Sequence, residues 1–418
     1  MPHFTRLSLC PPSLCVEVVF VHVRTPVPFR NATLQIAVFF LIYYLAQGCL
    51  IPYLPPYYKS LGLSGSELSM LSSIAPFIMI FAPPVWGFLS DRSGRPVRTL
   101  QIAMAGSALL FLPLFAVHSG AGLAAVLACQ ALFATAITSL ADTVTVAEAL
   151  RLNTDYGRLR VAGSLGYVVG AYGFGAALAG GYGLNHVLWI GAIGLAFAAV
   201  STLALPQSKP VTAHQAPSFR EAAQLLHNGA FVAFLITGML HWAALQSYYL
   251  LYALRIEELN VSPQFVGIGI AAGIATEVAL MWSFRNLLQR LPLLPFLALS
   301  IVSSILRWSL TAWFSSGAAV AAMQALHGLT LGGFYVGSIA YLEQSIPPPL
   351  RATGRALLAS ISLGLGAVLG NLIAGRLLDY GGTSAGYYGA AGLDILALIP
   401  LAACALLATS RRIKVVPR

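Results

Sequence analysis

The feature that most constrains this chain is a series of apolar stretches, each long enough to cross the roughly 20-residue hydrocarbon core of a bilayer. They fall at 33–57, 66–90, 97–117, 120–149, 158–181, 185–205, 229–254, 262–286, 292–314, 316–345, 354–378 and 386–409. In lipid every backbone polar group needs an internal partner, which a helix supplies within one segment. The pattern predicts an all-α membrane protein with twelve transmembrane helices.

Composition supports this prediction and excludes other classes. Hydrophobic residues make up 58% of the chain and charged residues only 9%, whereas soluble domains carry about a quarter charged residues. Most of the surface is therefore expected to face the lipid bilayer. The net charge of +10 is spread as short basic groups between apolar spans, without a basic face, so no nucleic-acid partner is expected.

A polar interruption divides the spans into two sets of six. We predict an N-terminal tail (1–30) without an assigned function, an N-terminal six-helix bundle (31–205), a cytoplasmic linker (206–228), a C-terminal six-helix bundle (229–410) and a C-terminal tail (411–418). Glycine-rich spans follow an arginine pair in each half, Arg158 with Arg160 and Arg351 with Arg355. This echo indicates a duplicated unit, and the glycines themselves are expected to allow close helix packing.

The distribution of basic residues predicts the orientation. Of the 23 Lys and Arg residues, 19 fall in segments on one side of the predicted membrane. The other side holds Lys59, Arg255 and Arg376, and Arg307 lies within a span. Cytoplasmic loops carry an excess of Lys and Arg. We therefore expect a multi-pass protein of the cell inner (cytoplasmic) membrane with both termini in the cytoplasm.

Several enzymatic functions are excluded by what the chain lacks. Its only lysines are Lys59, Lys209 and Lys414, and none follows a glycine-rich phosphate-binding loop. No HExxH motif occurs, and the five cysteines have no metal-ligand spacing. We expect no enzyme, no cofactor and no metal, which leaves transport driven by a gradient.

Ionisable residues inside the spans mark the predicted transport path, because each costs at least about 2.5–3.5 kcal/mol in lipid and usually faces a cavity or a partner. We expect Asp142 to pair with Arg160 in the N-terminal half, and Glu277, Arg307 and His327 to form a cluster in the C-terminal half. An acid held ionised by an arginine can take a proton when the pair is disturbed. The alternative is that these groups are fixed ion pairs that lock helices together.

The loop after the second span carries a family signature. Gly87, Asp91, Arg92, Gly94 and Arg95 fit the pattern G-x-x-x-D-[RK]-x-G-R, so this loop resembles that of the major facilitator superfamily. The resemblance covers essentially the whole chain after residue 30. It implies two six-helix bundles, close helix contact at Gly87, and a gating charge network at the cytoplasmic loop that can latch one state.

A finer resemblance is to the lactose permease branch, and within it to the phenylpropionate permease type. The stretch from Asp155 to Tyr167 is similar to the start of the fifth span in that group. The resemblance places Asp142 and Arg160 at a substrate-binding pair and Tyr167 at a ring that stacks on substrate. It likewise matches Glu277, Arg307 and His327 to an acid, an arginine and a histidine of that branch.

The departures from lactose permease limit what carries over. Thr330 stands where that permease has a proton-carrying acid, and Gln324 where it has a lysine. Proton coupling through the same residue is therefore excluded, and Glu277 becomes the expected proton acceptor, tuned by Arg307 and His327. The expected substrate-binding residues are Asp142, Arg160, Tyr167, Gln246 and His327.

The sequence thus predicts a proton-coupled symporter that works by alternating access on a small organic solute, either an aromatic acid, a nucleoside or a sugar. A monomer is expected. Two alternatives stay open: an exporter of amphipathic compounds with the same fold, and a membrane receptor or scaffold that transports nothing.

Overall fold

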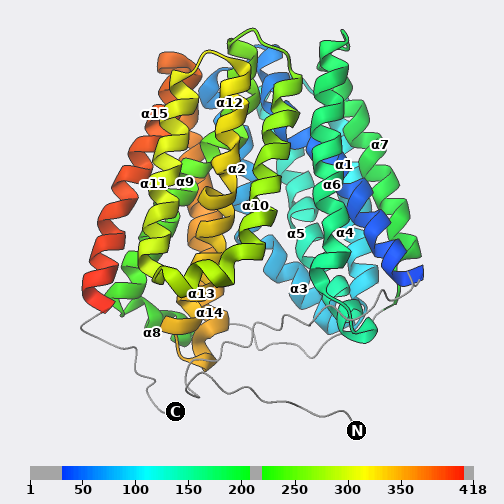
Figure 1. Cartoon of the computed structure of the whole chain (residues 1–418). Coiled ribbons are helices and arrows are strands. Elements are labelled where there is room, and N and C mark those ends of the chain that lie inside the picture. Colours follow the sequence, from blue (N-terminus) through cyan, green and yellow to red (C-terminus); the bar gives the residue numbers. More distant parts are fainter. Residues whose placement is uncertain (1–30, 208–218, 409–418) are drawn as a thin grey trace.

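The computed structural model describes residues 31–207 and 219–408, and within them nearly all residues are helical (Figure 1). The predicted tails 1–30 and 411–418, and part of the predicted linker, lie outside the described residues. Eleven described helices are long and apolar enough to cross a membrane. The chain is therefore a multi-pass, all-α membrane protein, as the apolar spans predict.

The N-terminal half contains six spans. They are α1 (Asn31–Ser60), α2 with α3 (Gly65–Met79 and Ala82–Ser93), α4 with the short helix η1 (Pro96–Phe111 and Leu112–Phe115), α5 (Gly120–Leu152), α6 (Tyr156–Ala179), and α7 with η2 (His186–Ser201 and Thr202–Ala204). A capping box begins α2, in which the Ser64 N–H donates to Glu67 Oε2 (2.8 Å) and the Glu67 N–H donates to Ser64 Oγ (3.2 Å).

The C-terminal half begins with a short helix that the sequence analysis does not predict. Its elements are α8 (Phe219–Leu226), α9 (Gly229–Glu258), α10 (Gln264–Arg290), α11 (Leu293–Trp313), α12 (Gly317–Met323), η3 (Gln324–Leu326), the π-helix η4 (Gly328–Gly333), α13 (Phe334–Ser345), η5 (Pro348–Leu350), α14 (Arg351–Leu358), the π-helix η6 (Ala359–Gly366) and α15 (Ala367–Ala408). The spans thus agree with the predicted ones to within a few residues.

The last candidate helix accounts for the difference between eleven and twelve. It runs from Pro348 to Leu407 over 60 residues, far longer than one crossing needs. Gly381 and Gly382 have non-helical backbone angles inside it, and Gly382 has φ 69°, a conformation that glycine adopts without strain. The chain reverses here, so this stretch supplies the eleventh and twelfth spans.

Glycines let the helices of each half approach one another closely. A Cβ on Gly170 of α6 would lie 2.2 Å from the carbonyl oxygen of Leu45 on α1, and one on Gly370 of α15 would lie 2.1 Å from that of Ala243 on α9. The first and fifth spans of each half therefore pack in the same way, as the predicted internal repeat requires.

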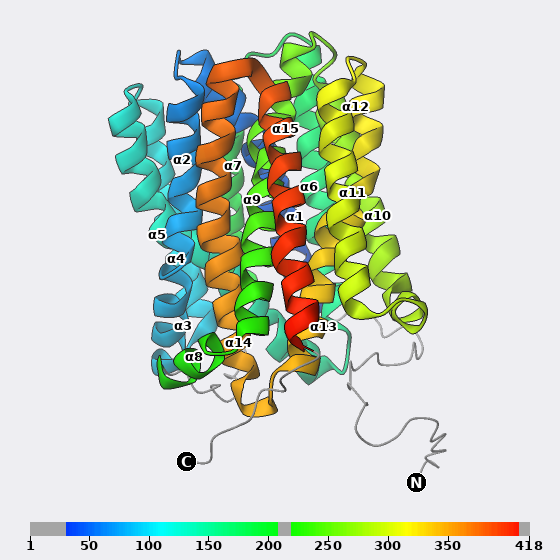
Figure 2. The ribbon, with the colours of Figure 1, turned by 90° about the vertical axis from the view of Figure 1, so that its left-hand side faces the viewer.

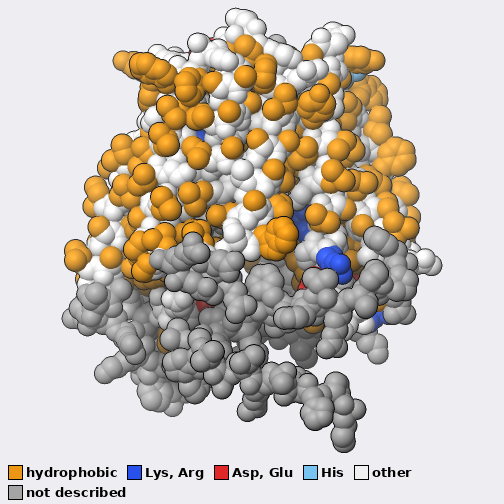
Figure 3. All heavy atoms as spheres, viewed as in Figure 1, with side chains coloured by type: hydrophobic (Ala, Val, Ile, Leu, Met, Phe, Trp, Pro, Cys, Tyr) orange, Lys and Arg blue, Asp and Glu red, His pale blue; other side chains and the backbone are white. Residues whose placement is uncertain are grey.

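The flanks of the bundle suit a hydrocarbon environment. Figure 3 shows hydrophobic side chains spread widely over the part of the face that is not grey, and large residues such as Trp313 and Leu203 are 75% and 71% exposed. Such extensive apolar exposure marks a membrane-embedded surface. We call the end that carries Arg92, Arg95 and Arg98 the basic end, and the end that carries Lys59 and Gly382 the opposite end.

The two halves are joined at the opposite end. Asp379 of α15 binds the start of α2, and these two helices run side by side in Figure 2. Lys59 and Glu257 form an ion pair of 3.9 Å across the halves. A Cβ on Gly267 of α10 would lie 2.3 Å from Tyr172 Cα of α6. These contacts close the path between the halves at that end.

Candidate functional site

A charged pair lies where α5 and α6 face α1 in the N-terminal half. Arg160 Nε is 3.4 Å from Asp142 Oδ1, and the Tyr156 hydroxyl donates to the same oxygen at 2.8 Å. Arg160 also donates to the Tyr44 hydroxyl and lies over the Phe40 ring at 4.8 Å. The structure thus brings the predicted partners Asp142 and Arg160 together, while their role in binding stays a prediction.

The Asp142–Arg160 pair is partly exposed. The side chain of Asp142 is 35% exposed and that of Arg160 is 25% exposed. Both lie toward the basic end of their helices, because α5 ends at Leu152 and α6 begins at Tyr156. With the opposite end closed by contacts, these partly exposed groups mark the predicted path between the halves.

Glu277 is the second acid on this path, and it lies on α10. It is half-buried and forms no hydrogen bond or ion pair with any side chain that the structure describes, a set that leaves out the side chains of residues 285, 286, 289 and 290 on the same helix. Its side chain rests against Gly332 of η4, where a Cβ would lie 2.8 Å from Glu277 Cγ. The expectation that Glu277 forms one cluster with Arg307 and His327 is therefore not met by direct contact.

Arg307 and His327 do contact each other, and both are more deeply buried than Glu277. Arg307 is fully buried, and its guanidinium donates to Gln324 Oε1 (2.6 and 3.1 Å), Thr330 Oγ1 (2.9 Å) and His327 Nδ1 (3.0 Å). Because an arginine only donates, His327 Nδ1 must accept. While this bond is present, His327 is a neutral imidazole and cannot bind a further proton at Nδ1.

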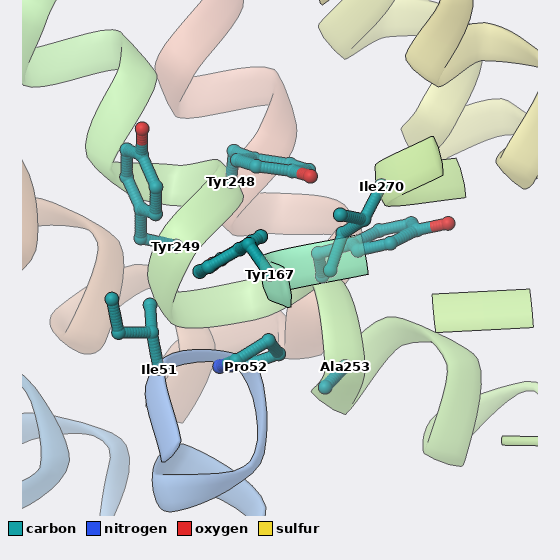
Figure 4. Close-up of a pocket in the computed structure, with 8 residues that line it drawn as sticks. Ile51, Pro52, Tyr167, Tyr248, Tyr249, Ala253 and Ile270 are labelled. Atoms are coloured by element: carbon teal, nitrogen blue, oxygen red, sulfur yellow. The ribbon is translucent and has the colours of Figure 1, made fainter. Parts of the chain in front are cut away.

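Aromatic rings from both halves meet between these charged groups. A small pocket is lined by residues of α1, α6, α9 and α10, namely Ile51, Pro52, Tyr167, Tyr248, Tyr249, Tyr252, Ala253 and Ile270 (Figure 4). Tyr167 comes from the N-terminal half and lies beside Tyr248 and Tyr249 of the C-terminal half. The Arg307 guanidinium lies over the Tyr248 ring at 4.7 Å, so this ring separates the pocket from the buried arginine.

Gln246, the remaining predicted binding residue, is buried on α9, three residues before Tyr249. The residues that line the pocket do not include it. Its contact with a substrate therefore stays a prediction.

The loop signature lies at the basic end, at the junction of α3 and α4. Gly94 has φ 61° and ends α3, donating its N–H to the carbonyls of Ser90 and Asp91. Asp91 and Arg92 are exposed, and Arg95 lines a surface hollow. Nothing lies within 4 Å of the position that a Cβ on Gly87 would take, so the expected close helix contact at Gly87 is not formed in this arrangement.

The sequence analysis missed a buried cluster in the C-terminal half. His241 Nδ1 is 2.6 Å from Asp394 Oδ1, its Nε2 is 2.9 Å from the carbonyl oxygen of Thr330, and Trp308 Nε1 donates to Asp394 Oδ2 at 2.9 Å. His241, Asp394 and Trp308 are all 0% exposed. Asp394 is an acid within an apolar span, and the criterion that selected Asp142 would also have selected it.

Comparison with known proteins identifies the family of this chain. The model of the MFS_1 like family matches residues 33–388. An uncharacterized transporter of Bacillus subtilis (strain 168), YwbF, is 27% identical over 82% of this chain and 86% of its own. The maltose permease of Geobacillus stearothermophilus is 26% identical over 82% of this chain and 86% of its own.

Solved structures agree with this fold. The crystal structure of the nucleoside transporter NupG superposes with a TM-score of 0.79 at 17% identity, over 91% of this chain and all of that one. A POT family peptide transporter superposes with a TM-score of 0.68 at 14% identity, over 93% of this chain and 98% of that one.

Proposed function

Because the chain belongs to the MFS_1 like family, we propose that it is a secondary transporter that carries a small, neutral, hydroxylated solute across the inner membrane by alternating access. The two predicted bundles, 31–205 and 229–410, would rock about the path between them. The structure described here would be the form open toward the basic end, which we assign to the cytoplasm from the distribution of Lys and Arg. The assignment to the lactose permease and phenylpropionate permease branch stays a prediction.

The charge of the accessible groups favours a neutral solute. Asp142, Arg160 and Glu277 are partly exposed, and the one arginine among them is already paired with Asp142. Arg307 is fully buried and engaged by neutral partners. An anionic solute would therefore meet an uncompensated acid at Glu277, whereas a hydroxylated solute could donate hydrogen bonds to it.

The rings favour a solute with a flat or ring-shaped part. Tyr167 and Tyr248 face the same small pocket from opposite halves (Figure 4), and aromatic faces stack on sugar rings and bases. Two relatives are named as a maltose permease and a nucleoside permease. A nucleoside is therefore our first candidate and a sugar the second, ahead of an aromatic acid.

For coupling, we propose proton symport, with Glu277 exchanging protons with water in the path. Its half-exposed position and its lack of a partner in the described chain support this role. Arg307 and His327 form no hydrogen bond with Glu277, and η4 lies between them, since Thr330 accepts from Arg307 and Gly332 contacts the Glu277 side chain.

The substrate class is tested by uptake into cells that lack their own nucleoside and sugar permeases and express this chain. Labelled uridine, adenosine, maltose, glucose and phenylpropionate would be compared at equal concentration. We expect uptake of a nucleoside or a sugar that unlabelled compound competes away. Uptake of phenylpropionate alone would contradict the proposal. Resistance to amphipathic toxins without uptake of any solute would also contradict it and would indicate an exporter.

A receptor or scaffold would retain its function when Asp142, Glu277 and Arg307 are replaced by neutral residues.

A further inference from the structure

We propose that His241 and Asp394 form a second, buried proton-binding site that holds one exchangeable proton and couples it to the movement of η4. This inference rests on the proposed transport function, including solute contact at Glu277, but not on proton exchange by Glu277. It starts from hydrogen-bonding geometry, since the two side chains come from α9 and α15 and are 153 positions apart in the chain.

The geometry requires the proton. His241 Nε2 faces the carbonyl oxygen of Thr330 at 2.9 Å, and a carbonyl can only accept, so Nε2 carries a hydrogen. His241 Nδ1 then faces Asp394 Oδ1 at 2.6 Å. Without a proton between them, two lone pairs would meet at that distance in a fully buried site. The pair is therefore in its protonated form, either as imidazolium with carboxylate or as imidazole with carboxylic acid, and it has no net charge.

The surroundings make this site sensitive to its proton. Trp308 Nε1 donates to the other carboxylate oxygen at 2.9 Å, and the Phe334 ring lies 4.1 Å from the His241 ring. Other titratable or charged groups on the packed elements are Arg307 of α11, His327 beside η4, and Tyr387 of α15, whose ring stacks on Trp308. Loss of the proton would leave a net negative charge in this fully buried site, which is costly in low dielectric.

The π-helix η4 connects this site to the path. Thr330 accepts from His241 through its carbonyl and from Arg307 through its hydroxyl. On another face of η4, Gly332 contacts the Glu277 side chain of α10. Single-turn π-helices occur frequently at functional sites. A solute that binds Glu277 and shifts η4 would move the Thr330 carbonyl away from His241. The Nε2–H would then lose its acceptor and could pass its proton to a water molecule that enters with this movement. His241 would remain a neutral imidazole whose Nδ1–H donates to the Asp394 carboxylate.

The first test uses purified protein and no solute. Nitrogen-15 NMR, with His241→Gln to assign the signal, reports the protonation of both ring nitrogens, and infrared spectroscopy reports a protonated carboxyl group that Asp394→Asn removes. At neutral pH we expect either a doubly protonated His241 or a protonated Asp394. A singly protonated His241 beside an ionised Asp394 would overturn the proposal.

The second test separates proton coupling from solute binding. In Asp394→Asn we expect exchange of labelled for unlabelled solute to stay within about twofold of the parent protein, and accumulation against a gradient to fall to the equilibrium level. Accumulation like that of the parent would overturn the inference, as would loss of exchange in a folded variant, which indicates a structural role. A parent protein that transports nothing in the panel refutes the proposed function instead, and the spectroscopic test still decides this one.

A third variant shifts the site without removing it. Trp308→Phe deletes the N–H that donates to Asp394 Oδ2. The nitrogen-15 or infrared signals of the pair should then differ from those of the parent protein, because the carboxyl group has lost this bond. Trp313→Phe, on the same helix with an exposed ring, is the matched control and should leave these signals unchanged. Unchanged signals in Trp308→Phe would count against the site.

Discussion

The carboxylate of Asp379, near the point where α15 reverses, accepts a hydrogen bond of 2.5 Å from the backbone N–H of Gly65 in the first turn of α2. Ser66 donates to the other carboxylate oxygen through its N–H (2.8 Å) and its hydroxyl (2.6 Å). The C-terminal half thereby supplies an anion to a helix N-terminus of the N-terminal half, where the helix dipole favours negative charge. This contact closes the opposite end.

Asp379→Asn is predicted to weaken this closure. The variant keeps one acceptor oxygen but loses the charge, at a cost of roughly 1 kcal/mol for an exposed site, which shifts the populations of the two states about fivefold. Spin labels on the α1–α2 and α9–α10 loops should report a larger fraction of molecules in which these two loops are far apart. Glu257→Gln is the matched control, because its ion pair with Lys59 spans the same end but is longer and half-exposed. Equal effects from both substitutions would contradict a specific role for Asp379.

Asp91 occupies the related place at the basic end, at the C-terminus of the second span, and is exposed here. We predict that it latches the other state, in which the basic end is closed. Asp91→Asn should therefore raise the fraction open toward the basic end, the opposite direction from Asp379→Asn, and the same spin labels measure it. A shift in the same direction as Asp379→Asn would contradict the latch.

Gly170→Ala is predicted to destabilise the N-terminal half. Its new Cβ would meet the Leu45 carbonyl oxygen at 2.2 Å, and overpacking of this kind costs about 1–3 kcal/mol. The loss is read as a lower unfolding temperature of the purified protein. Gly173→Ala lies on the same helix with nothing within 4 Å, and should be neutral or stabilising. A neutral Gly170→Ala would show that α1 and α6 pack less tightly than described.

Asp142→Asn is predicted to weaken solute binding. It removes the charge that balances Arg160, while the remaining amide oxygen can still accept from the Tyr156 hydroxyl. We expect KM for uptake to rise about tenfold, which corresponds to roughly 1.4 kcal/mol. Tyr156→Phe keeps the ion pair and should have a smaller effect. An unchanged KM in Asp142→Asn would indicate that the Asp142–Arg160 pair has a purely structural role.

The sequence predicts the fold because the period and length of its apolar spans are local properties. The partnership of Asp142 with Arg160 was also accessible, since both lie in adjoining spans. The contact of His241 with Asp394 was not, because it depends on how α9 packs on α15. The π-helix that carries Thr330 was equally inaccessible, since its sequence reads as ordinary apolar helix and the packing of its neighbours decides its hydrogen bonding.

The central claim, proton-coupled import of a neutral hydroxylated solute, is tested most directly by the external pH of weakly buffered, de-energised cells that express the chain. Addition of the transported nucleoside or sugar should raise the external pH, and Glu277→Gln should abolish that rise. A labelled nucleoside or sugar that moves downhill without any pH change would contradict proton coupling and leave a uniporter.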